Sequence, residues 1–287
     1  MTGPSPDPYA PFLCDLQAVA RARKLVICAP GVLTRVSIFD PVKQWRSQGW
    51  EPVFYPFPGL DGRALSPALD VGAAARSIAA LVQAQADKQI CLLGFSTGGA
   101  IMIEAAALLG GAVKVAAIAP GLPRAGGWAT MQATTRDVIA AAWRCRSLAV
   151  RRVWLEYYRV LLVGRAGLDV PERAALARAI TAERAAHMVY PEGGLLRAHV
   201  RGLRRWSGPG GRLQTPRNLS LFIGGDDPVF STQATRAFAK TLGEVRIREY
   251  PDHGHMLFVT HPGVFDDVLA FFSEADHEAA KQTGLSD

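Results

Sequence analysis

Short apolar stretches alternate with helix-like stretches along most of the chain. Runs rich in β-branched and aliphatic residues, each closed by a turn or a helix, predict strands at 24–29, 53–57, 90–95, 113–119, 219–223 and 245–250. Apolar residues repeating every three or four positions predict helices at 70–86, 98–109, 232–242 and 262–273. Strands separated by helices of this length are joined by crossovers and lie parallel. The pattern therefore predicts an α/β fold with a mostly parallel sheet of about six strands flanked by helices.

One apolar stretch, residues 90–122, is long enough for a membrane span. A hydrocarbon layer of about 30 Å needs roughly 20 apolar residues, but this stretch contains Glu104, Lys114 and several glycines. Strands buried on both faces of a parallel sheet give equally continuous apolar runs. We therefore expect two core strands around a buried helix, and no transmembrane segment.

The composition restricts the cofactor and the compartment. Four cysteines in a chain of 287 residues form no C-x-x-C pair, which indicates reduced thiols and neither a zinc site nor a disulfide framework. Residues 1–12 contain four prolines and no basic-then-apolar signal region, so we expect a cytoplasmic protein. We also expect no metal and no organic cofactor.

Positive charge is concentrated in one part of the chain. Residues 124–212 contain 16 arginines, no lysine and 6 acidic residues. The arginines are spread at helical spacing, which is typical of solvated helix faces. No nucleic-acid-binding motif accompanies them, so we expect no nucleic-acid partner. Apolar residues at intervals of three and four predict helices at 148–162, 171–188 and 195–206.

A helical block inserted between two strands of a parallel sheet is typical of a lid. This interpretation divides the chain into an N-terminal extension at 1–23, a core at 24–120 and 213–276, a helical cap at 121–212 and a polar C-terminal tail at 277–287.

The candidate chemistry begins at a G-x-S-x-G motif, Gly94-Phe95-Ser96-Thr97-Gly98, between a predicted strand and a predicted helix. This is the context of a nucleophile elbow, in which the serine occupies a sharp, strained turn. Gly94 and Gly98 are needed because the strand and helix approach closely there. The hydroxyl of Ser96 would then project from the carboxyl edge of the sheet, beside free N–H groups of the helix N-terminus.

A serine hydroxyl needs a neighbouring base, and two histidines are placed to provide one. His253 and His255 directly follow the last predicted strand, at the same sheet edge as Ser96. The sequence alone does not choose between them. The other four are interpreted as surface or hydrogen-bonded polar residues, or lie at a helix start or in the tail: His187, His199, His261 and His277.

The base in turn needs a carboxylate that fixes its tautomer. Asp226 and Asp227 follow the predicted strand at 219–223, again at the carboxyl edge. They could equally form an ordinary Asp-Pro turn. Because all three kinds of group follow parallel strands, in the order Ser, Asp, His, we expect them to meet.

On these residues the chain resembles the α/β-hydrolase family with a helical cap, over residues 24–273. The resemblance extends to Ala29-Pro30-Gly31-Val32, Pro58-Gly59-Leu60-Asp61-Gly62, Gly224-Gly225-Asp226-Asp227-Pro228-Val229 and Gly254-His255. The Gly-x-x-Asp spacing typical of the family implies Asp227, and its Gly-His pair implies His255.

The resemblance also implies an oxyanion hole built from the backbone N–H groups of Val32 and Thr97. The chain departs from the family at Pro30-Gly31, where many relatives have His-Gly, so a side-chain hydrogen bond that can organise this loop is missing. Thr97 stands where a bulkier residue is often found. The serine disfavours the dehalogenase and epoxide-hydrolase branches, which have Asp in that position.

The expected function is a serine hydrolase that cleaves a carboxylic ester of a small molecule through an acyl-enzyme intermediate. Two alternatives stay open. The arginine-rich cap could meet a coenzyme A phosphate, as in an acyl-CoA thioesterase or acyltransferase, or the protein could be a non-catalytic binding protein on the same fold. Aromatic residues of the cap suggest either an apolar pocket or simply a helical core: Trp128, Trp143, Trp154, Tyr157 and Tyr158.

Overall fold

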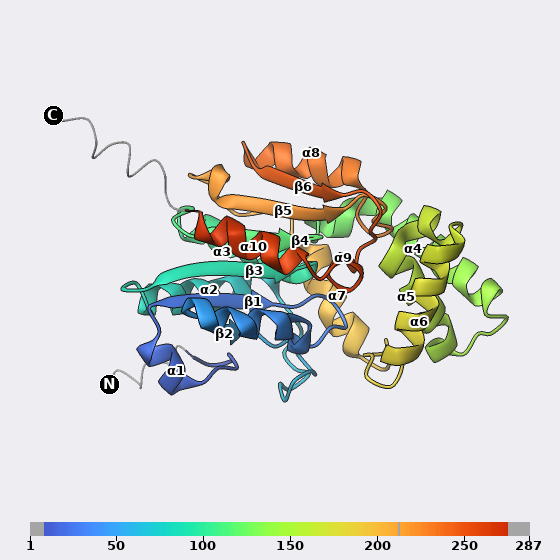
Figure 1. Cartoon of the computed structure of the whole chain (residues 1–287), viewed down its shortest axis with the longest axis horizontal. Coiled ribbons are helices and arrows are strands. Elements are labelled where there is room, and N and C mark those ends of the chain that lie inside the picture. The colour runs from blue at the N-terminus through green and yellow to red at the C-terminus, as the bar shows by residue number, and fades with distance from the viewer. Residues whose placement is uncertain (1–8, 212, 275–287) are drawn as a thin grey trace.

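The computed structural model describes residues 9–211 and 213–274, and its centre is one parallel sheet (Figure 1). Within these residues the sheet has six strands in the order β2-β1-β3-β4-β5-β6, every pair parallel. The strands are β1 (Lys24–Ala29), β2 (Trp50–Phe54), β3 (Gln89–Phe95), β4 (Lys114–Ile118), β5 (Leu219–Gly224) and β6 (Arg246–Tyr250). The predicted fold class is confirmed.

The residues of β1 alternate between the two faces of the sheet, as the two-residue period of a strand requires. Leu25 and Ile27 belong to one apolar cluster, and Val26 and Cys28 to a second on the opposite face. Because all four are fully buried, the strand appears in the sequence as a continuous apolar run.

Helices cover both faces of the sheet. Apolar residues of α2 (Val71–Ala84), α3 (Thr97–Leu108) and α8 (Thr232–Leu242) join the first cluster. The second cluster takes residues from the 3-10 stretch η1 (Val36–Gln48), α9 (Leu257–Thr260) and α10 (Val264–Ser273). The remaining short elements are α1 (Leu16–Arg21), η2 (Pro123–Gly126) and η3 (Pro216–Asn218).

Four helices lie between β4 and β5 in the chain: α4 (Gly127–Arg144), α5 (Val150–Leu168), α6 (Pro171–Arg184) and α7 (Leu195–Arg205). We call residues 123–205 the helical insertion. Figure 1 shows α4, α5 and α6 gathered beyond one end of the sheet, with α7 closer to it. The helix predicted at 148–162 is observed as α5 and extends to Leu168, because the chain resumes helical geometry after a break at Gly164 (φ 76°).

The second strand is displaced from its predicted position at 53–57. It pairs with β1 from Trp50 to Phe54, and the apolar run then continues into a loop that buries Phe57. Pro52 within β2 is tolerated because β2 is at the edge of the sheet.

The apolar stretch at 90–122 contains β3, α3 and β4. None of the helices described is both long enough and apolar enough to cross a bilayer. The first eight residues of the predicted N-terminal extension and the predicted tail at 277–287 lie outside the described residues.

Candidate active site

Ser96 occupies the sharp turn between β3 and α3. Its backbone angles are φ 51° and ψ −118°, a region that residues other than glycine rarely adopt and that costs about 1–3 kcal/mol. The two glycines of the motif make the turn sterically feasible. A Cβ on Gly94 would lie less than 3.0 Å from the backbone of Gly98, and one on Gly98 less than 3.0 Å from the backbone of Ala29.

Gly98→Ala is expected to lower the free energy of unfolding by about 1–3 kcal/mol, because the new methyl group would overlap backbone that cannot move aside. Urea denaturation followed by circular dichroism measures this. The matched control is Gly72→Ala in α2, where a Cβ has no neighbour closer than 3.4 Å and alanine favours the helix. Equal stability of Gly98→Ala and the wild type would contradict the close approach.

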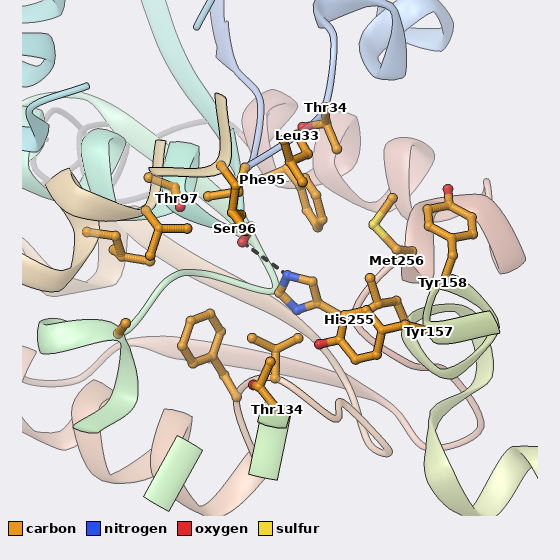
Figure 2. A pocket seen from close by; sticks show the side chains of 18 of the residues that line it. Leu33, Thr34, Phe95, Ser96, Thr97, Thr134, Tyr157, Tyr158, His255 and Met256 are labelled. Carbon is orange, nitrogen blue, oxygen red and sulfur yellow. Dashed lines mark hydrogen bonds between the residues drawn. The ribbon is translucent and has the colours of Figure 1, made fainter. Parts of the chain in front are cut away.

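Three of the predicted side chains are hydrogen-bonded in series. Ser96 Oγ lies 3.0 Å from His255 Nε2, the bond dashed in Figure 2, and His255 Nδ1 lies 2.7 Å from Asp227 Oδ2. All three residues are buried. Because an ionised carboxylate only accepts hydrogen bonds, Nδ1 carries the imidazole proton and Nε2 is free to accept one from Ser96.

Asp227 is itself fixed by its own loop. Its Oδ1 accepts hydrogen bonds from the backbone N–H groups of Val229 (2.7 Å) and Phe230 (3.0 Å). The second oxygen is thereby turned toward His255. A carboxylate held in this way keeps the imidazole in one orientation.

The alternates Asp226 and His253 make other contacts. Asp226 Oδ2 accepts from the N–H of Gly167 in α5 at 3.1 Å, and His253 Nδ1 lies 2.7 Å from Thr260 Oγ1. Burial lowers the pKa of His253, and the nearby charge of His261 lowers it further. The sequence left open two aspartates and two histidines. Of these, the structure brings Asp227 and His255 into the series of hydrogen bonds with Ser96.

The loop after β1 lies against the serine. A Cβ on Gly31 would be 2.9 Å from the Cβ of Ser96, so only glycine allows this approach. The N–H of Gly31 donates to Thr34 Oγ1 (2.7 Å), and the N–H of Leu33 donates to His199 Nδ1 (3.2 Å). Both N–H groups that flank Val32 are thus occupied by side chains.

His199 is a residue whose position the sequence did not reveal. It is fully buried (0 % exposed), and burial lowers its pKa although its hydrogen bond to the Pro58 carbonyl oxygen acts in the opposite direction. A sequence signal existed, since His199 shares the buried face of α7 with Ala198, Gly202 and Leu203. A polar residue on an apolar helix face needs a partner.

The helical insertion is hydrogen-bonded to the loops that carry the acid and the histidine. The N–H groups of Gly254 and Met256, on either side of His255, donate to the carbonyls of Leu162 (3.1 Å) and Leu161 (2.9 Å) in α5. Arg165 forms two bonds with Asp137 of α4 (2.8 and 2.7 Å) and one with the Pro228 carbonyl (2.9 Å). The insertion therefore supports the site directly.

The break at Gly164 makes this docking sterically feasible. A Cβ on Gly164 would lie less than 3.0 Å from the carboxylate of Asp226. Its left-handed φ, which glycine adopts without strain, lets α5 turn alongside the acid loop.

A cavity of about 780 Å³ lies between the insertion and these loops, and Ser96 and His255 line it. Figure 2 shows the bonded pair Ser96 and His255 among other side chains that line the cavity, including Phe95, Thr97 and Tyr157. The walls of the cavity are largely aromatic and aliphatic: Phe95, Trp128, Met131, Trp154, Tyr157, Tyr158, Leu161 and Phe230. Burial raises the pKa of Tyr157, and the negative charges of Asp137 and Asp227 raise it further, so this phenol stays neutral.

Polar and charged groups also line the cavity. Thr97 Oγ1 and Trp154 Nε1 are buried without a hydrogen-bond partner among the described residues, and both residues line the cavity. Five arginines also line it: Arg35, Arg124, Arg184, Arg204 and Arg205. The cavity thus suits a mostly apolar molecule with a few polar atoms. Over residues 9–211 and 213–274, no group of three or more His, Cys, Asp or Glu side chains is arranged to hold a metal ion.

Residues 26–268 match the model of the alpha/beta hydrolase family. Solved structures with a similar fold include an alpha/beta hydrolase fold protein from Chitinophaga pinensis (16 % identity, TM-score 0.63, covering 92 % of each chain). Two esterases are also similar. That from Exiguobacterium antarcticum has 14 % identity and a TM-score of 0.60, covering 92 % of this chain and 94 % of that one. That from Thermogutta terrifontis has 14 % identity and a TM-score of 0.59, covering 87 % and 89 %. At these identities the structural likeness concerns the fold alone.

Proposed function

Because the chain belongs to the alpha/beta hydrolase family, we propose that it is a serine hydrolase that cleaves a carboxylic ester of a small molecule. Ser96 is the nucleophile, His255 the general base and acid, and Asp227 the carboxylate that orients the imidazole. The observation that carries the proposal is the continuous series of hydrogen bonds, 3.0 Å from Ser96 to His255 and 2.7 Å from His255 to Asp227.

The proposed reaction begins with proton transfer from Ser96 to His255. His255 Nε2 takes the hydroxyl proton as Ser96 Oγ attacks the ester carbonyl, and the carbonyl oxygen becomes an oxyanion. The N–H groups of Val32 and Thr97 stabilise it. Thr97 opens α3, so its N–H has no partner within the helix.

The tetrahedral intermediate then loses the alcohol, which receives the proton from His255, and the acyl group remains on Ser96. Water attacks this acyl-enzyme while His255 takes its proton, and return of that proton to Ser96 releases the carboxylic acid. The helical insertion (residues 123–205) acts as a cap that walls the cavity and excludes bulk water.

The apolar lining favours an ester with an apolar acyl group or alcohol. A second candidate is an acyl-CoA thioester, and the observation that favours it is the set of arginines on the wall. Arg124, Arg204 and Arg205 are exposed and could meet phosphate groups. Turnover of acyl-CoA that falls steeply with salt, while that of a short nitrophenyl ester does not, would favour this candidate.

A fluorophosphonate probe tests the proposal. The wild type should be phosphonylated at Ser96, detected by mass spectrometry of the intact chain and its peptides, and should hydrolyse p-nitrophenyl butyrate. Ser96→Ala should do neither, since the alanine methyl group cannot form the bond to phosphorus. Ser77→Ala, at a partly exposed serine of α2, is the matched control and should be labelled like the wild type.

Labelling that persists in Ser96→Ala would refute the assignment of the nucleophile. A folded wild type that is neither labelled nor active on any ester or thioester would favour a non-catalytic binding protein.

A further inference from the structure

We propose that His199, in α7 of the helical insertion, is a positioning residue that holds the loop after β1 so that the N–H of Val32 faces the substrate carbonyl at Ser96. The inference rests on the proposed function for its catalytic consequence. The histidine acts through the backbone of Leu33, and it touches neither Ser96 nor the reacting atoms.

The hydrogen bonds of His199 fix its protonation state. Nδ1 lies 3.2 Å from the N–H of Leu33, and Nε2 lies 2.7 Å from the carbonyl oxygen of Pro58. A backbone amide can only donate and a carbonyl can only accept, so the ring is neutral with its proton on Nε2. A second proton, on Nδ1, would place an N–H donor of the ring against the N–H donor of Leu33.

The ring is held firmly from both sides. It is fully buried and packs edge-on against Phe57, with ring centroids 5.4 Å apart. The helix behind it is anchored to the core, because the N–H of Leu69 donates to the Ala198 carbonyl at 3.0 Å. Gly202 lets the two backbones approach, since a Cβ there would lie less than 3.0 Å from the Leu69 carbonyl.

The loop needs such a support. Leu33 has φ 55°, a left-handed conformation that is unfavourable for a residue with a Cβ. Thr34 holds the N–H of Gly31 on one side of Val32, and His199 holds the N–H of Leu33 on the other. With both neighbours tied, the peptide between them has a fixed orientation, and the N–H of Val32 is the one left to face an oxyanion.

Two substitutions separate this role from simple packing. In His199→Asn the amide oxygen reaches the position of Nδ1 and can still accept from Leu33, while the bond to Pro58 is lost. In His199→Gln the amide nitrogen reaches the position of Nε2 and can still donate to Pro58, while the acceptor for Leu33 is lost. Both variants lose one buried hydrogen bond, so their stabilities serve as a matched comparison.

His199→Gln is expected to lower kcat for p-nitrophenyl butyrate by about 10²-fold, with KM changed much less, because loss of one oxyanion-hole donor costs about 10²–10³. His199→Asn should retain kcat within about tenfold of the wild type. Equal kcat losses in the two variants at equal stability, or a greater loss in His199→Asn, would overturn the positioning role.

Amide hydrogen exchange of Leu33, followed by NMR, gives a readout that does not depend on catalysis. Exchange should be faster in His199→Gln than in His199→Asn or the wild type. Equal exchange in all three proteins would overturn the inference even if the enzyme is active. If the wild type does not react with the fluorophosphonate but the exchange rates differ as expected, the proposed function fails and the support of the loop stands.

Discussion

His255→Ala is expected to lower kcat for p-nitrophenyl butyrate by about 10⁶-fold, close to complete loss of covalent catalysis. In the part of the chain that the structure describes, His255 is the imidazole that hydrogen-bonds Ser96. Without it the hydroxyl keeps its proton, and an unactivated serine is a poor nucleophile. Steady-state kinetics and the rate of fluorophosphonate labelling measure the effect, and both should fall together.

His253→Ala is the matched control, two residues away in the same loop. Its ring bonds Thr260, and loss of one such bond costs about 1 kcal/mol of stability, so kcat should stay within about tenfold of the wild type. Thermal melting confirms that both variants are folded. If His253→Ala is inactive and His255→Ala is active, the base has been assigned to the wrong histidine.

Asp227→Asn is expected to lower kcat by about 10⁴-fold, because it reverses the tautomer of His255. The N–H groups of Val229 and Phe230 hold one side-chain oxygen of residue 227, so an asparagine keeps its oxygen there and turns its NH₂ toward His255. Nδ1 must then accept, and the imidazole proton moves to Nε2. A ring with its proton on Nε2 cannot take the proton of Ser96.

Asp226→Asn provides the comparison for this change. The asparagine oxygen can still accept from the N–H of Gly167, as Asp226 does at 3.1 Å, so kcat should remain within about tenfold of the wild type. The pair is measured under the same conditions, with kcat and KM determined separately. A large loss in Asp226→Asn together with an active Asp227→Asn would exchange the roles of the two carboxylates.

The periodic pattern predicted the sheet better than the helices outside it. The buried strands produce continuous apolar runs, and β5 and α8 lie close to where the pattern placed them. In contrast, α4 was not predicted. Its Trp128 and Trp143 are 68 % and 79 % exposed, so its apolar residues do not form a stripe that faces a core. The 3-10 stretch η1 contains Pro41 and lacks the 3.6-residue period on which helix prediction depends.

The site divides in the same way between local and long-range features. The elbow could be predicted because its requirements lie within five consecutive residues around Ser96. The choice between His253 and His255 could not be made from residue types, because it depends on loop geometry. The absence of His-Gly after β1 left the support of that loop unexplained, and the structure places His199, 166 residues from Leu33 in the sequence, in contact with it.

The break in α5 has a consequence for how molecules enter the cavity. In an unbroken helix the carbonyls of Leu161 and Leu162 would be bonded four residues onward, but here they receive the amides around His255. The helix that covers Ser96 and the loop that holds His255 are therefore joined by backbone hydrogen bonds. A movement of α5 away from the sheet would break these bonds and displace the general base. We therefore expect a substrate to enter the cavity without displacement of α5.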